Sequence, residues 1–212
     1  MQTLSISAVT DKRFLVNSYL ITVSDHAILI DPVLNEDIKK ALSGVLLDFV
    51  IITHEHYDHN AVHLLTLKPE TIVIRSKDAL QNGTYFTFDY CGLHIEAVPA
   101  CNKNHPINEC VGYLIELEGT TIYVAGDTSF VPFMETNLAK RHIDYAFLPI
   151  DGIYNMGPEE ATKVANIIKP VHLLPYHTHP GMLFDVAQAM KVRYDGGMLL
   201  QAGRAFVFGE NE

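Results

Sequence analysis

The stretch THEHYDHN, residues 53–60, directly follows the apolar run of residues 49–52 and largely decides how this chain is interpreted. Three of the chain's 11 histidines and one aspartate lie between positions 54 and 59. A short, continuous apolar run of this kind is typical of a buried strand. The sequence therefore predicts that four side chains able to bind a metal emerge where one strand ends.

The spacing within this stretch suits two neighbouring metal ions. In an extended segment, side chains two positions apart point the same way, so His54 and His56 can converge on one ion. Asp58 and His59 then turn toward a neighbouring point. Imidazole and carboxylate ligands suit zinc, iron, nickel or manganese, and a stretch without thiolates is unlike a closed structural zinc site. The pattern favours an open, catalytic site over a solvated polar loop or a chance histidine tract.

Three further apolar runs are each followed by a potential ligand. They are residues 97–100 before His105, residues 123–125 before Asp127, and residues 171–174 before His177 and His179. Loops at one edge of a sheet face one cavity, held by a rigid scaffold. We therefore expect these side chains to meet the histidine stretch at a single edge.

The order of predicted elements indicates a layered α/β protein. Alternating apolar residues and turns predict strands at residues 4–9, 19–23, 27–30, 71–75, 85–88, 94–98, 112–117, 121–125, 145–150 and 171–174. Helices are predicted at residues 36–43, 134–141, 158–168 and 185–193. Mixed strands with interspersed helices predict two sheets flanked by helices. The chain has no internal repeat or linker, so we expect one domain spanning residues 1–212.

Composition limits the classes of partner. The formal net charge of −10, with no stripe of lysine and arginine, disfavours long nucleic acids and anionic membranes. No stretch approaches the roughly 18 apolar residues of a membrane span, and the start MQTLSISAVT lacks signal-peptide features, so we expect a cytoplasmic protein. Cys91, Cys101 and Cys110 are odd in number and lack CxxC spacing, which disfavours a disulfide framework. A small-molecule substrate is the expected partner.

The motifs together resemble a known family. HEHYDH matches the HxHxDH signature of the metallo-β-lactamase fold, and a later histidine, a strand before GDT and a strand before a final histidine follow in the same order. AVPACNKNHP, VGYLIELEGTTIYVAGDTS, IDYAFLPIDGIYNMGPEEA and IKPVHLLPYHTHP resemble a subgroup of small stand-alone metal-dependent hydrolases, and more distantly the sugar-lactonase branch. The resemblance covers residues 49–180 and implies an α/β fold, a four-layer αββα sandwich of two mixed β-sheets flanked by helices.

The resemblance also implies a ligand set for two divalent ions. His54, His56 and His105 would bind one metal, Asp58, His59 and His177 the other, and Asp127 would bridge them. Cys101 is an alternative to His105, and His179 competes with His177 or serves as a supporting group, a proton donor or a surface residue. Zn²⁺ is the first candidate, with Mn²⁺, Ni²⁺ or Fe²⁺ as alternatives.

The implied chemistry is hydrolysis. Two cations about 3.5–4 Å apart would hold a bridging hydroxide at neutral pH and present it to a carbonyl or phosphoryl centre. Asp58, Asp127 and His179 are the candidate catalytic residues. Two divalent cations outweigh two aspartates and one hydroxide, which favours an anionic substrate carrying a lactone, thioester or phosphoester bond. The alternatives are an inactive metal-binding or metabolite-binding protein, or a phosphodiesterase acting on nucleotides, for which Lys103 is the only basic residue in the motif loops.

Three other residues receive provisional roles. Asp31 follows the strand of residues 27–30 and either orients the metal loop or caps a turn at Pro32. Tyr154 and Asn155, in the loop-like stretch DGIYNMGPEE, are candidate substrate contacts.

Overall fold

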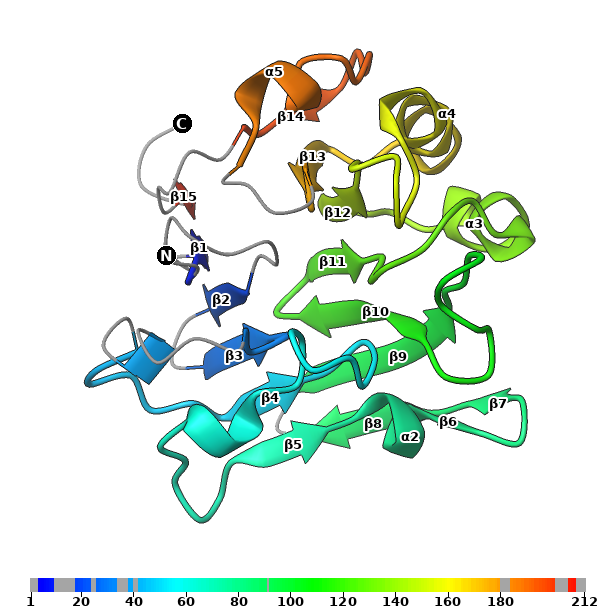
Figure 1. The fold of residues 1–212 in the computed structure, drawn as a ribbon. Helices are drawn as coiled ribbons and strands as arrows, with labels where there is room; N and C mark the ends of the chain where they lie inside the picture. The colour runs from blue at the N-terminus through cyan, green and yellow to red at the C-terminus, as the bar shows by residue number, and fades with distance from the viewer. Residues whose placement is uncertain are drawn as a thin grey trace.

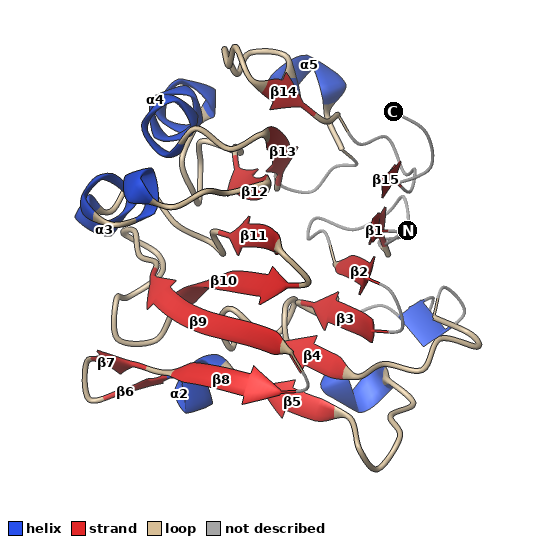
Figure 2. Ribbon diagram, turned by 180° about the vertical axis from the view of Figure 1, so that it is seen from behind, coloured by secondary structure: helices blue, strands red, loops and turns tan. Residues whose placement is uncertain are grey.

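The computed structural model describes residues 4–9, 18–23, 26–33, 38–39, 42–90, 92–179, 184–200 and 206–208. Two mixed sheets pack face to face, and helices lie on their outer sides (Figure 1). Figure 2 shows the same layers from behind. The layered α/β fold expected from the sequence is confirmed.

The first sheet is built from strands at both ends of the chain. Its strands are β1 (Leu4–Ala8), β2 (Tyr19–Val23), β3 (His26–Ile30), β4 (Phe49–Ile51), β5 (Ile72–Ile74) and β15 (Phe206–Phe208). Within the described residues their order is β15-β1-β2-β3-β4-β5. Strands β15 to β3 pair antiparallel, whereas β3, β4 and β5 run parallel, so β3 and β4 end at the same edge.

The second sheet carries the centre of the chain. Its strands are β8 (Thr87–Tyr90), β9 (Leu93–Pro99), β10 (Val111–Leu117), β11 (Thr120–Val124), β12 (Tyr145–Pro149), β13 (His172–Tyr176) and β14 (Gly197–Met198). Their order in the described part is β14-β13-β12-β11-β10-β9-β8. Because β9 and β11 both run antiparallel to β10, and β11 to β13 are parallel, the carboxyl ends of β9, β11, β12 and β13 share one edge.

The remaining elements are short apart from one helix. They are α2 (Ser76–Ala79), α3 (Pro132–Thr136), α4 (Pro158–Ile168), α5 (Val186–Ala189), the 3-10 helices η1 (Val62–Leu64) and η2 (Leu138–Lys140), and the hairpin of β6 (Leu80–Gln81) with β7 (Thr84–Tyr85). None of the helices in the described ranges is long and apolar enough to cross a bilayer. The predicted helix at residues 158–168 is confirmed as α4.

Two predicted helices are shorter than expected. The helix predicted at residues 134–141 breaks at Asn137, whose φ of −122° and ψ of −57° are not helical. The helix predicted at residues 185–193 ends with α5, and the backbone of Arg193 turns away to donate to the hydroxyl of Thr162 on α4. The helix predicted at residues 36–43 lies largely outside the described residues, of which 38 and 39 are helical.

Three apolar clusters separate the four layers. The central cluster lies between the sheets and includes Ile28 and Ile30 of β3, whereas Leu29 of the same strand joins the cluster on the outer face of the first sheet. A third cluster covers the second sheet, where α4 presents residues at helical spacing: Ala161, Val164, Ala165 and Ile168. Strands buried on both faces explain the continuous apolar runs in the sequence.

Candidate metal centre

Six strands deliver buried polar side chains to one edge of the sandwich. The strands β3, β4, β9, β11, β12 and β13 are followed, respectively, by Asp31, His54, His105, Asp127, Asp151 and His177. All six side chains are buried. Buried polar groups are costly unless they are paired or bind a ligand. The expected convergence of strand-end residues on one edge is therefore found.

Residues at this edge have positive φ angles. Asp31 and His177 have φ angles of 46° and 49°, in the left-handed region that costs a non-glycine residue on the order of 1 kcal/mol. Gly126, before Asp127, has a φ of 69°, and a Cβ there would lie 2.8 Å from the Val111 carbonyl oxygen. The sequence needs glycine at that position so that the β11 exit can pass close to Thr53.

Two buried tyrosines donate hydrogen bonds to the backbone at the same edge. The hydroxyl of Tyr113 donates to the carbonyl of Ile52 at 3.0 Å, and the hydroxyl of Tyr176 donates to the carbonyl of Gly126 at 2.6 Å. Burial raises the pKa of both phenols well above 10, so they remain donors. These bonds fix the positions from which His54 and Asp127 project.

Asp31 organises the first-sheet side of the site. Its two carboxylate oxygens accept from the backbone N–H and the hydroxyl of Thr53, at 2.8 Å and 2.7 Å. Because the Thr53 hydroxyl proton is used on Asp31, its oxygen accepts from Nδ1 of His54 at 3.0 Å. Asp31 Oδ2 also lies 3.2 Å from Nδ1 of His59. These contacts support the role of Asp31 in orienting the loop.

The histidines on the second-sheet side are held in the same way. Nδ1 of His105 donates to the side-chain carbonyl of Asn102 at 3.0 Å. Nδ1 of His177 lies 3.2 Å from Oδ2 of Asp151. The contact of His177 with Asp151 is an ion-pair distance without hydrogen-bond geometry. The Nε2 atoms of both rings face Asp127, whose Oδ2 lies 3.4 Å from each.

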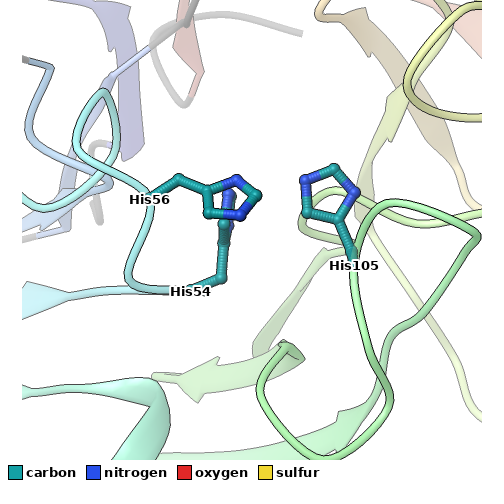
Figure 3. Close-up of side chains that lie close together, drawn as sticks. All are labelled: His54, His56 and His105. Atoms are coloured by element: carbon teal, nitrogen blue, oxygen red, sulfur yellow. The ribbon is translucent and has the colours of Figure 1, made fainter.

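The potential ligand atoms gather in groups. Among the residues that the structure describes, His54, His56 and His105 form one set whose ligand atoms all lie within 4.8 Å of one another, called here the His54 group. Figure 3 shows the rings of His54 and His56 beside that of His105. His59, Asp127 and His177 form a second set, the His59 group. A third set, of Asp31, His54 and His59, reflects the orienting contacts of Asp31.

Two predicted site residues lie outside these groups as far as the described residues show. Asp58 is half-buried, and its charge contributes to raising the pKa of His59. His179 is half-buried two positions beyond His177, which is the member of the pair that contacts Asp127. Cys101, the alternative to His105, packs against the apolar cluster that covers the second sheet.

The loop after β12 contributes more than the sequence indicated. Tyr154 is exposed, but Asn155 is buried and donates to Asp127, so its contacts are with the site framework. Asp151 was not identified from the sequence, although it follows an apolar strand, as Asp127 does. Its position directly after that strand could have identified it. Its Oδ1 accepts the backbone N–H groups of the three residues 153–155, at 2.7, 2.6 and 3.2 Å.

The histidines of the two groups differ in basicity. Burial lowers the pKa of His54 well below 6.5, and the neighbouring His59 lowers it further. Burial also lowers the pKa of His105. For His59, burial opposes the charged form, but the carboxylates of Asp127 and Asp31 outweigh it and raise the pKa to about 9.

The same carboxylates are stabilised as anions. For His177, burial again disfavours the charged form, but Asp127 and Asp151 raise its pKa above 6.5. Burial opposes ionisation of Asp127, yet His177 and His59 hold its pKa well below the usual range. Asp151 is likewise opposed by burial, and its contacts with His177 and the backbone lower its pKa to about 2.

The donor set fits divalent metal ions. Nε2 of His54 and Oδ1 of Asp127 are buried and have no hydrogen-bond partner within the described residues. A buried polar atom without a partner calls for an explanation such as an ion. Imidazole nitrogens and carboxylate oxygens gathered within a few ångströms are ligands for zinc and similar cations.

The comparisons with known proteins agree with this geometry. The sequence model of the Beta-lactamase superfamily domain matches residues 14–177. The UPF0173 metal-dependent hydrolase of Thermococcus onnurineus is 34% identical over 202 residues, covering 85% of this chain and 90% of that protein. The UPF0173 metal-dependent hydrolase of Thermococcus kodakarensis is 33% identical over 217 residues, covering 90% of this chain and 96% of that protein.

A solved structure shows the same fold at low sequence identity. The metallo-β-lactamase fold protein YhfI of Bacillus subtilis superposes with a TM-score of 0.72 at 16% identity, covering 98% of this chain and 100% of that one. The fold, the histidine and aspartate cluster and the sequence matches lead to one assignment. The chain belongs to the β-lactamase superfamily and, within it, to the UPF0173 family of metal-dependent hydrolases.

Proposed function

We propose that the chain hydrolyses an ester-type bond in a small anionic molecule, using two divalent cations held by the His54 group and the His59 group. The observation that carries this proposal is that each group holds a buried atom without a hydrogen-bond partner among the described residues, Nε2 of His54 in one and Oδ1 of Asp127 in the other. Cations bound there would lower the pKa of a water molecule and supply the nucleophile. Zinc is the first candidate for a histidine-rich site.

The protein's own residues have distinct roles in this proposal. Asp127 faces both groups and is the natural bridge between them. Asp58, whose charge acts on His59, is the candidate for orienting the attacking water and accepting its proton. His179, just beyond the His59 group, is the candidate proton donor to the leaving group.

A cavity beside the His54 group supports a small-molecule substrate. It has a volume of about 310 Å³, and His54 and His56 form part of its wall. Leu80 and Cys110, both buried, also line it, and its charged lining residues are Lys77, Glu55 and Glu109. A cavity of this size suits a metabolite. Two divalent cations would favour an anionic one. The proposed partner is a small molecule and not a long nucleic acid or a membrane. The cytoplasmic location stays a prediction.

The test is turnover by the metal-loaded protein. Untagged protein loaded with zinc or manganese is assayed against lactones, thioesters and phosphoesters, each as an anionic and a neutral analogue. We expect one class to be hydrolysed at least ~10³-fold faster than by the metal-depleted protein, with the anionic analogue preferred. The His56→Ala variant, loaded in parallel, serves as the inactive control. A loaded protein that binds these compounds but turns none over would overturn the proposal.

A further inference from the structure

One buried amide connects the loops that carry the second-sheet ligands. Asn155 is 8% exposed, and its Nδ2 donates to Oδ2 of Asp127 at 3.0 Å and to Oδ2 of Asp151 at 2.8 Å. Its Oδ1 accepts from Nδ2 of Asn102 at 3.0 Å. Both donor hydrogens and the carbonyl oxygen are therefore used, which fixes the orientation of the amide.

Asn102 extends this connection to the His54 group. Its side-chain oxygen accepts from the backbone N–H and from Nδ1 of His105, both at 3.0 Å. A continuous chain of contacts thus runs from His105 through Asn102 and Asn155 to Asp127. A branch runs through Asp151 to His177. The chain joins members of both ligand groups, so a change at its centre reaches both.

We propose that Asn155 is a positioning residue that fixes the carboxylate of Asp127 and, through Asn102, the ring orientation of His105. This inference rests on the proposed binding of two cations. Asn155 places a donor between two buried carboxylates, which would otherwise repel each other across a region of low dielectric. With that donor present, Asp127 Oδ1 stays free to bind a cation.

The effect on His105 follows from the orientation of the Asn102 amide. Asn155 accepts from the Asn102 nitrogen, and the Asn102 oxygen accepts from Nδ1 of His105 and from the backbone N–H groups of Asn104 and His105. That oxygen keeps the proton on Nδ1 and leaves Nε2 with a lone pair. Without Asn155 the Asn102 nitrogen loses its acceptor, so the amide that holds Nδ1 of His105 is anchored from its oxygen side alone. The ring of His105 would then be held less firmly in the orientation that points Nε2 toward Asp127.

Metal affinity is the direct readout. Cobalt(II) is titrated into metal-depleted protein in competition with a chelator, and its visible spectrum reports the coordination at each group. Asn155→Ala should weaken cation binding at both groups, by ~10–100-fold. Asn102→Ala should weaken only the His54 group, by a similar factor. In the double variant, Asn102→Ala with Asn155→Ala, the fold-loss of cation affinity at the His54 group should be smaller than the product of the two single-variant losses. Both changes break the same chain of contacts, so their effects are not independent.

A matched control is provided by a neighbouring amide. Asn104 is exposed, and its Nδ2 donates to the backbone carbonyl of Tyr154 at 3.0 Å, so it ties the same two loops without contacting a ligand residue. Asn104→Ala should leave both affinities within about twofold of wild type. Circular dichroism of each variant confirms that it is folded at the temperature of the titration. If Asn155→Ala does not fold, Asn102→Ala decides the outcome.

The inference fails if Asn155→Ala or Asn102→Ala binds cobalt as the wild type does, or if Asn104→Ala loses as much. Failure of the proposed function looks different. A wild type with no hydrolytic activity, but with the predicted ranking of affinities, would remove the proposed function and leave the positioning role intact. If only one cation binds, its affinity in the three variants still tests the role of Asn155.

Discussion

The His54 group and the His59 group use the same ligand, imidazole, in opposite electrostatic settings. His54 and His105 are held by neutral partners, the hydroxyl of Thr53 and the amide of Asn102, and their pKa values are lowered. His59 and His177 contact the carboxylates of Asp31 and Asp151 as well as Asp127, and their pKa values are raised. At His59 and His177 the carboxylates, Asp127 first and then Asp31 or Asp151, outweigh burial, whereas burial prevails at His54 and His105.

This difference has a consequence for metal binding. A cation binds only the neutral imidazole, so at the His54 group it would meet His54 and His105 with lowered pKa values. At the His59 group it must displace protons, but the carboxylates that raised the pKa also make the neutral rings more basic ligands. We expect the two positions to differ in their dependence on pH and in their sensitivity to substitution.

The largest effect is expected from Asp127→Asn, which removes the charge that both groups face. Hydrolysis should fall by ~10³-fold or more, because the bridge between the cations loses its negative charge. The fold should be retained, since asparagine has nearly the same shape. Turnover and metal content are measured together. Near-wild-type turnover with both cations bound would refute the bridging role.

The next effect is on the stability of the metal-depleted protein. His59→Ala should lower the free energy of unfolding by ~3 kcal/mol, because it leaves a cavity and removes the positive partner of two buried carboxylates, Asp31 and Asp127. His56 is exposed, so His56→Ala should change the free energy of unfolding by no more than about 0.5 kcal/mol. Urea unfolding measures both. Equal losses of unfolding free energy in the two variants would contradict the expectation that the buried histidine stabilises the fold more than the exposed one.

A smaller effect is expected from Asp151→Asn. The variant removes the charge next to His177, so cation affinity at the His59 group should weaken by ~10–100-fold and that of the His54 group should change less. Asp144, at the other end of β12, also contacts a histidine, His142, at 3.0 Å, and Asp144→Asn is the matched control. Competition with a chelator gives the affinities. An equal loss in the control would show a general effect of charge.

The last prediction concerns pH dependence, where the effect of a single pH unit is the smallest of the four. The folded-state pKa of His59, about 9, lies above its ordinary value of 6.5. Its proton therefore stabilises the metal-depleted fold fully below pH 6.5, and this contribution is lost as the pH rises toward 9. Over that range, cation affinity at the His59 group should rise by up to ~10-fold per pH unit for each proton displaced.

Calorimetry in buffers of different ionisation enthalpy measures this proton release. We expect protons to be released on cation binding at pH 7 and fewer to be released above the pKa of His59. His54 and His105, whose pKa values are lowered, should release none there. An affinity that is the same for both groups at every pH would contradict the contrast between their Nδ1 partners.

The sequence indicated which residues form the two groups better than it indicated which residues orient them. His54, His56 and His59 lie in one short stretch, and His105, Asp127 and His177 each follow an apolar strand, so position along the chain was informative. The partners are set by side chains that meet across loops. Asn102 and Asn155, for example, are 53 positions apart, and no local pattern links them.

The same distinction applies to the fold. Helix α4 was predicted with its bounds because Pro158 and the apolar spacing of residues 161–168 are local signals. The break at Asn137 and the early end of α5 were not predicted. The second depends on the bond between Arg193 and Thr162, which joins segments distant in sequence. Local patterning therefore placed the elements, and tertiary contacts decided where some of them end.

The most direct test of the central claim is elemental analysis of untagged protein, comparing wild type with His56→Ala. We expect about two divalent ions per wild-type chain and about one in the variant, because His56 belongs to the His54 group alone. Little or no metal in the wild type, even after incubation with zinc and manganese, would contradict the presence of two cation sites at this edge.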